Sequence, residues 1–67
     1  MKQLQTHLKE HRQEAGLTQT ELAQLVDVSR KTINTVENGV FVPSTILSLK
    51  LARALNVRVE DLFQLPD

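Results

Sequence analysis

The chain has 67 residues, no cysteine, and eight basic against eight acidic side chains, so its formal net charge is zero. This length predicts a single domain over residues 1–67 with a thin core, since a domain this small buries only about 60% of its unfolded surface. The composition argues against a general polyanion binder, a disulfide framework, a membrane span and a secretory signal, so we expect a cytoplasmic protein with no membrane partner.

The first predicted helix has one face on which side chains recur every three or four residues, namely Leu4, Leu8, Arg12 and Ala15. Gly16 is expected to end it, because glycine readily takes the left-handed conformation that follows many helices. Arg12 lies on this otherwise apolar stripe, and a charge there needs a partner. Before this helix, residues 2–5 could pair as a short strand with the C-terminal tail.

A second helix is predicted to begin after Thr18. Thr18 and Glu21 have the capping-box spacing, in which each side chain accepts a free backbone N–H at the helix start. The apolar side of this helix is expected to consist of Leu22, Ala23, Leu25 and Val26. Asp27 then breaks the period and is expected to take a left-handed turn conformation.

Ser29 is a second N-cap and opens a third predicted helix, whose buried face is formed by Ile33 and Val36. The remaining side chains are polar and able to form hydrogen bonds: Arg30, Lys31, Thr32, Asn34 and Thr35. No acid occurs in residues 28–36, so this stretch carries only positive charge. Asn38, followed by a glycine, is expected to close the helix.

Two further helices are predicted after a loop at residues 40–43. Ser44 caps the fourth helix and Asn56 ends it. The inward stripe of this helix is expected to consist of Leu47, Leu51, Ala52 and Leu55. A short fifth helix covers residues 59–63, with two acids in its first turn, where they suit the helix dipole. The sequence therefore predicts an all-α fold of five helices.

The second and third predicted helices have the features of a helix-turn-helix over about residues 19–38. Both are short, and a tight turn joins them. The small Ala23, in the second helix, lets the third helix pack closely on it. The outer face of the third helix presents side chains that can read base edges in the major groove. Gln19, at the start of the second helix, places an amide and the positive end of that helix toward a phosphate. An ordinary solvated surface is the alternative interpretation of that outer face.

The chain resembles the Cro/C1-type (Xre) helix-turn-helix family of transcriptional regulators, in its small stand-alone form. The resemblance is carried by Leu-Thr-Gln-Thr-Glu-Leu-Ala at 17–23, Val-Ser-Arg-Lys-Thr-Ile-Asn at 28–34 and Glu-Asn-Gly at 37–39. Pro-Ser at 43–44, Leu-Ala-Arg-Ala-Leu at 51–55 and Glu-Asp-Leu-Phe at 60–63 extend it. It implies a compact five-helix, lambda-repressor-like DNA-binding domain that is not an enzyme.

The resemblance implies two groups of DNA contacts. The first lies against the sugar-phosphate backbone and consists of Gln19, Ser29 and Asn38. The second lies at base edges in the major groove and consists of Arg30, Lys31 and Asn34, with Thr32 and Thr35 beside them. Arg12 and Glu37 match an ion pair that in the family ties helix 1 to the end of helix 3, which agrees with the need of Arg12 for a partner.

Three features depart from the family pattern. Asp27 stands where the family usually has glycine, which predicts strain in the turn but the same fold. Val40 and Val42 replace residues that are usually basic or polar beside an aromatic, here Phe41. Ile46 likewise stands where a polar residue is usual. The loop is therefore expected to expose apolar surface and to lose a phosphate contact.

Other kinds of site are not predicted. His7 and His11 are four residues apart, but two histidines without a third ligand make a poor metal site, so we expect no metal and no cofactor. No nucleophile–base arrangement is recognisable, and two glycines in all exclude a glycine-rich phosphate loop. We therefore predict no catalysis.

These features predict a sequence-specific transcriptional regulator, a repressor, that binds a pseudo-palindromic operator on double-stranded DNA as a homodimer. Some apolar side chains either fill the thin core or form a partner surface: Val40, Phe41, Val42, Phe63 and Leu65. We favour a dimer contact through helix 5 and the tail. The alternative is an antitoxin-like module that binds and neutralises a partner protein and autoregulates its operon, which the apolar loop motivates.

Overall fold

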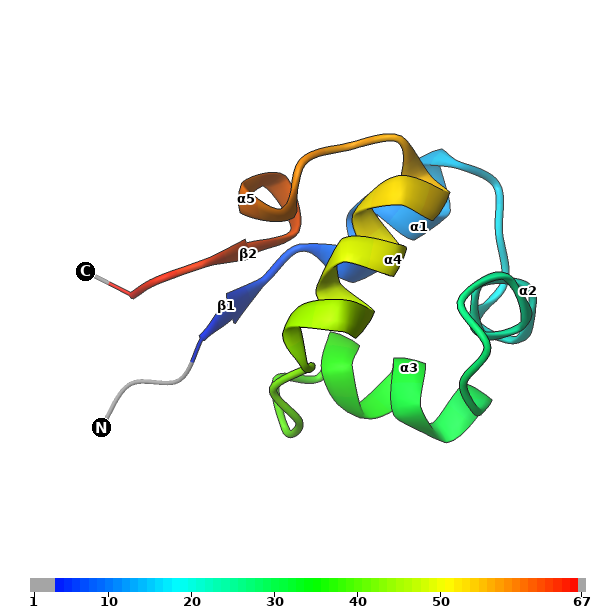
Figure 1. Cartoon of the computed structure of the whole chain (residues 1–67), viewed down its shortest axis with the longest axis horizontal. Coiled ribbons are helices and arrows are strands. Elements are labelled where there is room, and N and C mark those ends of the chain that lie inside the picture. The colour runs from blue at the N-terminus through cyan, green and yellow to red at the C-terminus, as the bar shows by residue number, and fades with distance from the viewer. Residues whose placement is uncertain (1–3, 67) are drawn as a thin grey trace.

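The computed structural model describes residues 4–66, and within them it contains five helices and one short antiparallel ladder (Figure 1). The elements in chain order are β1 (Gln5–Thr6), α1 (Leu8–Glu14), α2 (Gln19–Leu25), α3 (Arg30–Glu37), α4 (Thr45–Leu55), α5 (Val59–Leu62) and β2 (Phe63–Gln64). In Figure 1, α3 lies below α4, α2 lies on the right, and both strands lie on the left. The predicted five-helix fold is confirmed, and a short ladder joins the segments before α1 and after α5.

Capping groups predicted from the sequence set the bounds of the longer helices. The Ser29 hydroxyl accepts the N–H of Thr32 at 3.1 Å where α3 begins. The Ser44 hydroxyl accepts the N–H of Leu47 at 3.1 Å where α4 begins. Asn56 ends α4 with a φ of 56°, a left-handed conformation that asparagine tolerates better than most residues. These local signals therefore place the helices correctly.

The core lies among the five helices and is built from buried apolar side chains: Leu8, Leu22, Ala23, Val26, Ile33, Val36, Leu47, Leu51, Ala52, Leu55 and Leu62. The inward stripe predicted for α4 is confirmed, since all four of its members belong to this cluster. Burying a leucine, isoleucine or valine side chain contributes about 1.5–3 kcal/mol. A core with so few members depends on each of them.

Three residues predicted on inward faces lie elsewhere. Leu4 precedes β1 and is outside α1. Ala15 is exposed, because it is the C-cap of α1 and the chain turns away there. Leu25 is also exposed, because α2 turns Leu22 and Val26, which are one helical turn apart, toward the core.

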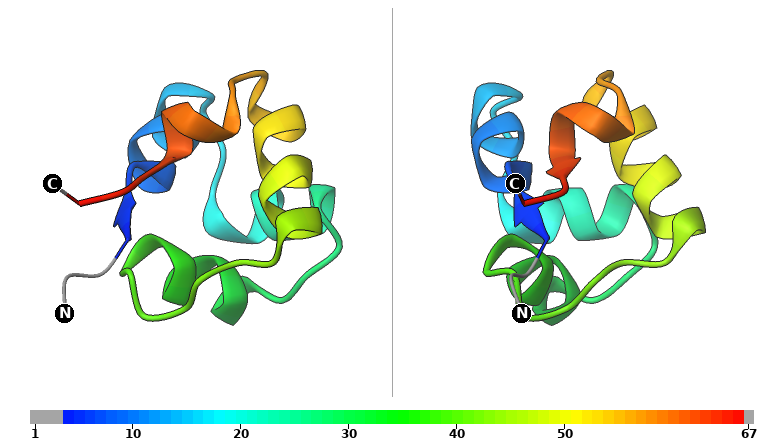
Figure 2. Two further views of the ribbon diagram at one scale, coloured as in Figure 1. Left: turned by 60° about the vertical axis from the view of Figure 1, so that its left-hand side comes forward. Right: turned by 90° about the vertical axis from the view of Figure 1, so that its left-hand side faces the viewer.

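The ladder pairs Gln5 with Gln64 and Thr6 with Phe63. Of the strand predicted at residues 2–5, Gln5 lies in β1 and Leu4 does not, and residues 2 and 3 lie outside the described part of the chain. The fifth helix ends one residue earlier than predicted, because Phe63 takes an extended conformation (φ −133°, ψ 136°) and enters β2. Figure 2 shows both strands at one end of the molecule.

None of the helices within residues 4–66 combines the length and the apolar character that a bilayer crossing requires. The longest, α4, has 11 residues, whereas a spanning helix needs about 20.

Candidate nucleic-acid interface

The helix-turn-helix predicted from the sequence is formed by α2, the turn after it, and α3. The Thr18 hydroxyl accepts the N–H of Glu21 at 3.1 Å, and the Glu21 carboxylate accepts the N–H of Thr18 at 2.8 Å, which confirms the capping box. Asp27 has a φ of 60°, the predicted left-handed conformation. The Val28 N–H then donates to the Ala23 carbonyl at 3.0 Å, which closes the turn and brings α3 against α2.

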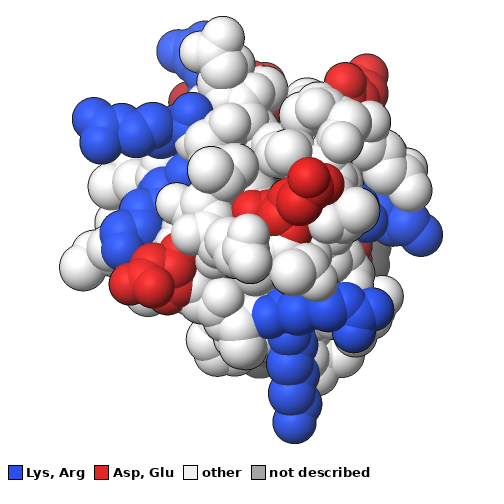
Figure 3. Space-filling view, turned by 90° about the vertical axis from the view of Figure 1, so that its right-hand side faces the viewer, with Lys and Arg blue, Asp and Glu red and all other residues white. Residues whose placement is uncertain are grey.

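One side of α3 is buried and the other is exposed. Its buried side chains, Ile33 and Val36, are those predicted. The side chains on the opposite side, here named the α3 outer face, are exposed: Arg30, Lys31, Asn34 and Asn38. No ion pair within residues 4–66 engages the two cations of this face. Figure 3 shows basic side chains projecting at the lower margin of the molecule, the side on which α3 lies.

Three hydroxyl residues of the predicted site are engaged with α3 itself. Ser29 Oγ caps the helix and also lies 3.0 Å from Thr32 Oγ1. Thr35 Oγ1 donates to the Thr32 carbonyl at 2.9 Å. Both threonines are half-buried, so they lie beside the α3 outer face and stabilise the helix that presents it.

Arg12 and Glu37 join α1 to the last residue of α3. Arg12 Nε lies 2.6 Å from Glu37 Oε2, and Arg12 Nη2 lies 3.3 Å from Glu37 Oε1. The remaining nitrogen, Nη1, donates to the Leu17 carbonyl at 2.8 Å. The two side chains are only 10% and 3% exposed, so each charge depends on the other. The C-terminal end of α3 is therefore fixed against α1.

The Gln19 side chain bridges α2 and α3. Its Nε2 donates to Glu37 Oε1 at 3.0 Å and to Asn34 Oδ1 at 3.2 Å. An amide nitrogen carries two hydrogens, and both form hydrogen bonds here. The predicted contact of this side chain with a phosphate would therefore require one of these two bonds to break. The main-chain N–H of Gln19 has no hydrogen-bond partner among the described residues. The bridge was not predicted from the sequence, although a helix-turn-helix brings the two amide side chains at these positions together.

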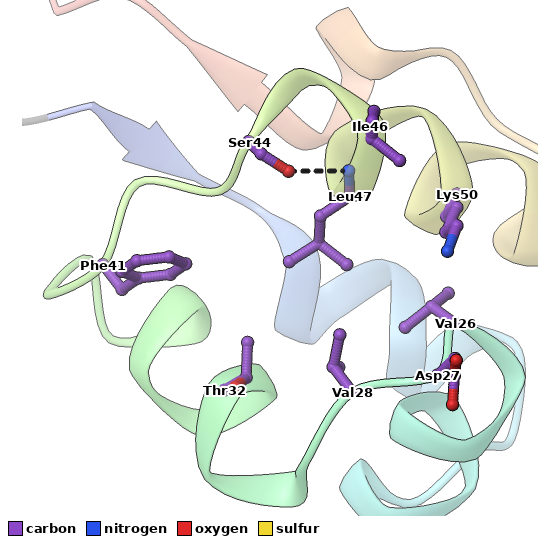
Figure 4. Close-up of a pocket in the computed structure, with 9 residues that line it drawn as sticks. All are labelled: Val26, Asp27, Val28, Thr32, Phe41, Ser44, Ile46, Leu47 and Lys50. Atoms are coloured by element: carbon purple, nitrogen blue, oxygen red, sulfur yellow. Dashed lines mark hydrogen bonds between the residues drawn. The ribbon is translucent and has the colours of Figure 1, made fainter.

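The loop after α3 exposes apolar side chains, as its departure from the family pattern predicted. Val40 and Val42 are 76% and 65% exposed, and Phe41 is also exposed. The N–H groups of Val40 and Phe41 both donate to the Thr35 carbonyl, at 2.9 and 3.2 Å, which holds the loop against the end of α3. Figure 4 shows the Phe41 ring on one side of a mainly apolar hollow between the turn and α4, with Lys50 on the other side.

The side chains whose place the sequence left open now separate into two groups. Phe63 packs against the core, as the default interpretation expected. The other four are exposed, and Leu65 is the most exposed of them at 83%. These four are Val40, Phe41, Val42 and Leu65.

The two histidines lie beside acids of α1. His7 Nδ1 is 3.6 Å from a Glu10 oxygen, and His11 Nδ1 is 3.6 Å from a Glu14 oxygen. The part of the chain that the structure describes holds no group of three or more histidine, cysteine, aspartate or glutamate side chains placed to share a metal ion.

A family model named HTH_3, helix-turn-helix, matches residues 8–62, which run from the first residue of α1 to the last residue of α5. The chain belongs to the HTH_3 helix-turn-helix family. An uncharacterized HTH-type transcriptional regulator of Methanothermobacter thermautotrophicus is 48% identical to it over 65 residues, which cover 96% of this chain and 94% of that protein. A similarly described regulator of Archaeoglobus fulgidus is 45% identical over 64 residues, which cover 96% and 91%.

Solved structures agree with this membership. The restriction-modification controller protein C.AhdI from Aeromonas hydrophila superimposes with a TM-score of 0.78 and 39% identity, over 84% of this HTH_3 chain and 85% of that one. The HTH_3 chain is therefore a transcriptional regulator with a helix-turn-helix DNA-binding domain and not an enzyme, the class predicted from its sequence. Its α3 outer face is the candidate DNA-binding surface.

Proposed function

We propose that the chain is a repressor that binds a pseudo-palindromic operator as a homodimer, with α3 of each protomer in the major groove. The observation that carries the proposal is the α3 outer face, which presents two cations and two amides and no acid. A helix of this kind fits the major groove, where each base pair has a distinct pattern of donors and acceptors. The capped start of α3 and its anchored end hold this face in place.

The contacts divide between bases and backbone. Arg30 or Lys31 pairs with O6 and N7 of guanine, and Asn34 pairs with N6 and N7 of adenine, each worth about 1–3 kcal/mol of discrimination. Ser29 and Asn38, at the two ends of α3, contact the sugar-phosphate backbone. The main-chain N–H of Gln19 adds a backbone contact at the start of α2.

The homodimer uses the part of the molecule that holds the 40–42 loop, α5 and β2, all of which lie opposite α2 in Figure 1. Val40, Val42 and Leu65 are exposed apolar side chains of these segments, and exposed apolar surface is typical of an interface. A domain with a thin core also gains stability from association. Two copies of α3 then read half-sites about 34 Å apart, one turn of DNA.

Repression follows from occupation of a promoter by the dimer. The zero net charge favours specific over general binding, because non-specific affinity comes from neutralising phosphates. A regulator of this kind acts where the chromosome is, in the cytoplasm.

Selection of bound DNA from a random pool tests the proposal. We expect an enriched motif of two inverted half-sites centred one helical turn apart, and a dimeric mass by light scattering at micromolar concentration. The matched control is the double variant Lys31→Ala, Asn34→Ala on the same pool. Absence of any enriched motif, or the same motif from the double variant, contradicts the assignment of α3.

The exposed loop also supports a second candidate, the antitoxin-like module that binds a partner protein and autoregulates its operon. Val40 and Val42 stand where the family usually has polar or basic residues, and both are largely exposed. Purification from the native host of a one-to-one complex that dissociates on Val40→Thr and Val42→Thr would favour this candidate. A homodimer that binds the operator tightly and carries no second protein favours the repressor.

A further inference from the structure

A continuous chain of hydrogen bonds runs from the buried ion pair to the DNA-facing surface. Arg12 donates to Glu37, Glu37 accepts from Gln19, and Gln19 donates to Asn34. We propose that Gln19 is a positioning residue that fixes the direction of the Asn34 amide and thereby determines which base edges Asn34 can pair with. This inference rests on the proposed function, in which Asn34 reads a base pair.

The direction of each amide follows from the chemistry of its neighbour. Glu37 is held by Arg12 as a carboxylate that can only accept, so Gln19 must turn its nitrogen, not its oxygen, toward it. The second hydrogen of that nitrogen points at Asn34, which must accept it with its oxygen, Oδ1. The Nδ2 group of Asn34 has no partner within residues 4–66 and is left for the DNA.

The exposed group of Asn34 is therefore a donor fixed in advance. It fits the acceptors on major-groove edges, which are N7 of the purines, O6 of guanine and O4 of thymine. Oδ1 keeps one lone pair, so the bidentate pair with N7 and N6 of adenine remains possible. Cytosine presents its N4 donor at this edge, and two donors facing each other are disfavoured. The geometry points to adenine as the preferred base and cytosine as the rejected one.

A double-mutant cycle tests the coupling. Binding constants are measured for the wild type, Gln19→Met, Asn34→Ala and the double variant on the selected operator, with each of the four base pairs at the position that Asn34 reads. Methionine has a similar length but no donor, so the amide of Asn34 becomes free to turn. We expect Gln19→Met to reduce discrimination at this one base pair about tenfold, within the range for one base contact. In the Asn34→Ala background the same change has no further effect on discrimination.

Three readouts separate this role from others. A phosphate contact by the Gln19 side chain would instead weaken binding equally on all four base pairs and reduce the salt dependence by about one phosphate. A purely structural role would lower the affinity by the same factor on all four base pairs and in both backgrounds, with the salt dependence unchanged. Either result overturns the proposal. If Asn34→Ala itself leaves base preference unchanged, the proposed reading by α3 fails instead, so the two failures are distinguishable.

Discussion

Glu37 accepts hydrogen bonds from Arg12 through both of its carboxylate oxygens, at 2.6 and 3.3 Å, and this contact connects the middle of α1 to the end of α3. The same carboxylate also accepts the Gln19 amide. One buried charge pair therefore supports both the fold and the surface proposed to read DNA. Substitutions in this pair are therefore expected to change both the free energy of unfolding and DNA recognition, which different experiments measure.

Removing the cation alone should strongly destabilise the protein. Arg12→Met leaves the Glu37 carboxylate buried without a partner, at an expected cost of about 3–5 kcal/mol. The double variant Arg12→Met, Glu37→Met should recover most of this loss, because two apolar side chains can fill the same space. Urea unfolding of the three proteins checks this prediction. A loss below about 1 kcal/mol for the single variant would mean that the pair behaves like an exposed one.

The α3 outer face should control sequence preference without controlling stability. Lys31→Ala combined with Asn34→Ala is expected to abolish discrimination among operators while changing the unfolding free energy by less than about 1 kcal/mol, since both side chains are exposed. Competition binding against a scrambled operator measures the first quantity. The matched control is Lys9→Ala with Gln13→Ala on the exposed side of α1, which should leave discrimination intact. Equal losses in both pairs would contradict the assignment.

The turn should tolerate glycine and resist alanine at position 27. Asp27 has a φ of 60°, where a side chain with Cβ is strained. Asp27→Gly should therefore be neutral or stabilising by up to about 1 kcal/mol, whereas Asp27→Ala should destabilise by about 1 kcal/mol. Thermal unfolding monitored by circular dichroism distinguishes the two. The reverse order would show that the aspartate side chain, and not the backbone, stabilises the turn.

The 40–42 loop should contribute to self-association. Val40→Thr with Val42→Thr keeps the shape of both side chains but adds hydroxyls, and is expected to raise the dimer dissociation constant about tenfold or more through loss of apolar burial. Sedimentation equilibrium provides the measurement. Ile46 is a similarly exposed β-branched residue on α4. The variant Ile46→Thr is therefore the control and should leave the dimer unchanged. If the control weakens the dimer and the loop variant does not, the interface lies on α4.

Local signals in the sequence predicted most of the fold. Hydroxyl caps such as Ser29 and Ser44, and the left-handed Asp27, act through neighbours within a few residues, so they can be recognised without a structure. Leu25 was misplaced, because spacing alone does not tell which of two adjacent helix faces is buried. The ladder was only partly predicted, because it joins short segments with little strand character across the whole length of the chain.

The candidate site was predictable in its membership more than in its geometry. Family resemblance, together with the need of a charge on an apolar stripe for a partner, indicated the Arg12–Glu37 pair from the sequence. The bridge from Gln19 to Asn34 depends on how α2 crosses α3, which spacing along the chain does not specify. Thr35 was expected beside the base-reading side chains, and its hydroxyl also donates to the Thr32 carbonyl, a contact that spacing along the chain did not predict.

The β1–β2 ladder has a consequence for the order in which the molecule assembles. Gln5 and Gln64 meet only after nearly the entire chain has closed into a loop, and the entropy lost in that closure is repaid by few hydrogen bonds. The contacts within the helix-turn-helix span much shorter loops and can form earlier. The ladder should therefore close last and open first, as a reversible clasp. Its amides are expected to exchange with deuterium through local opening, while α2 and α3 remain protected.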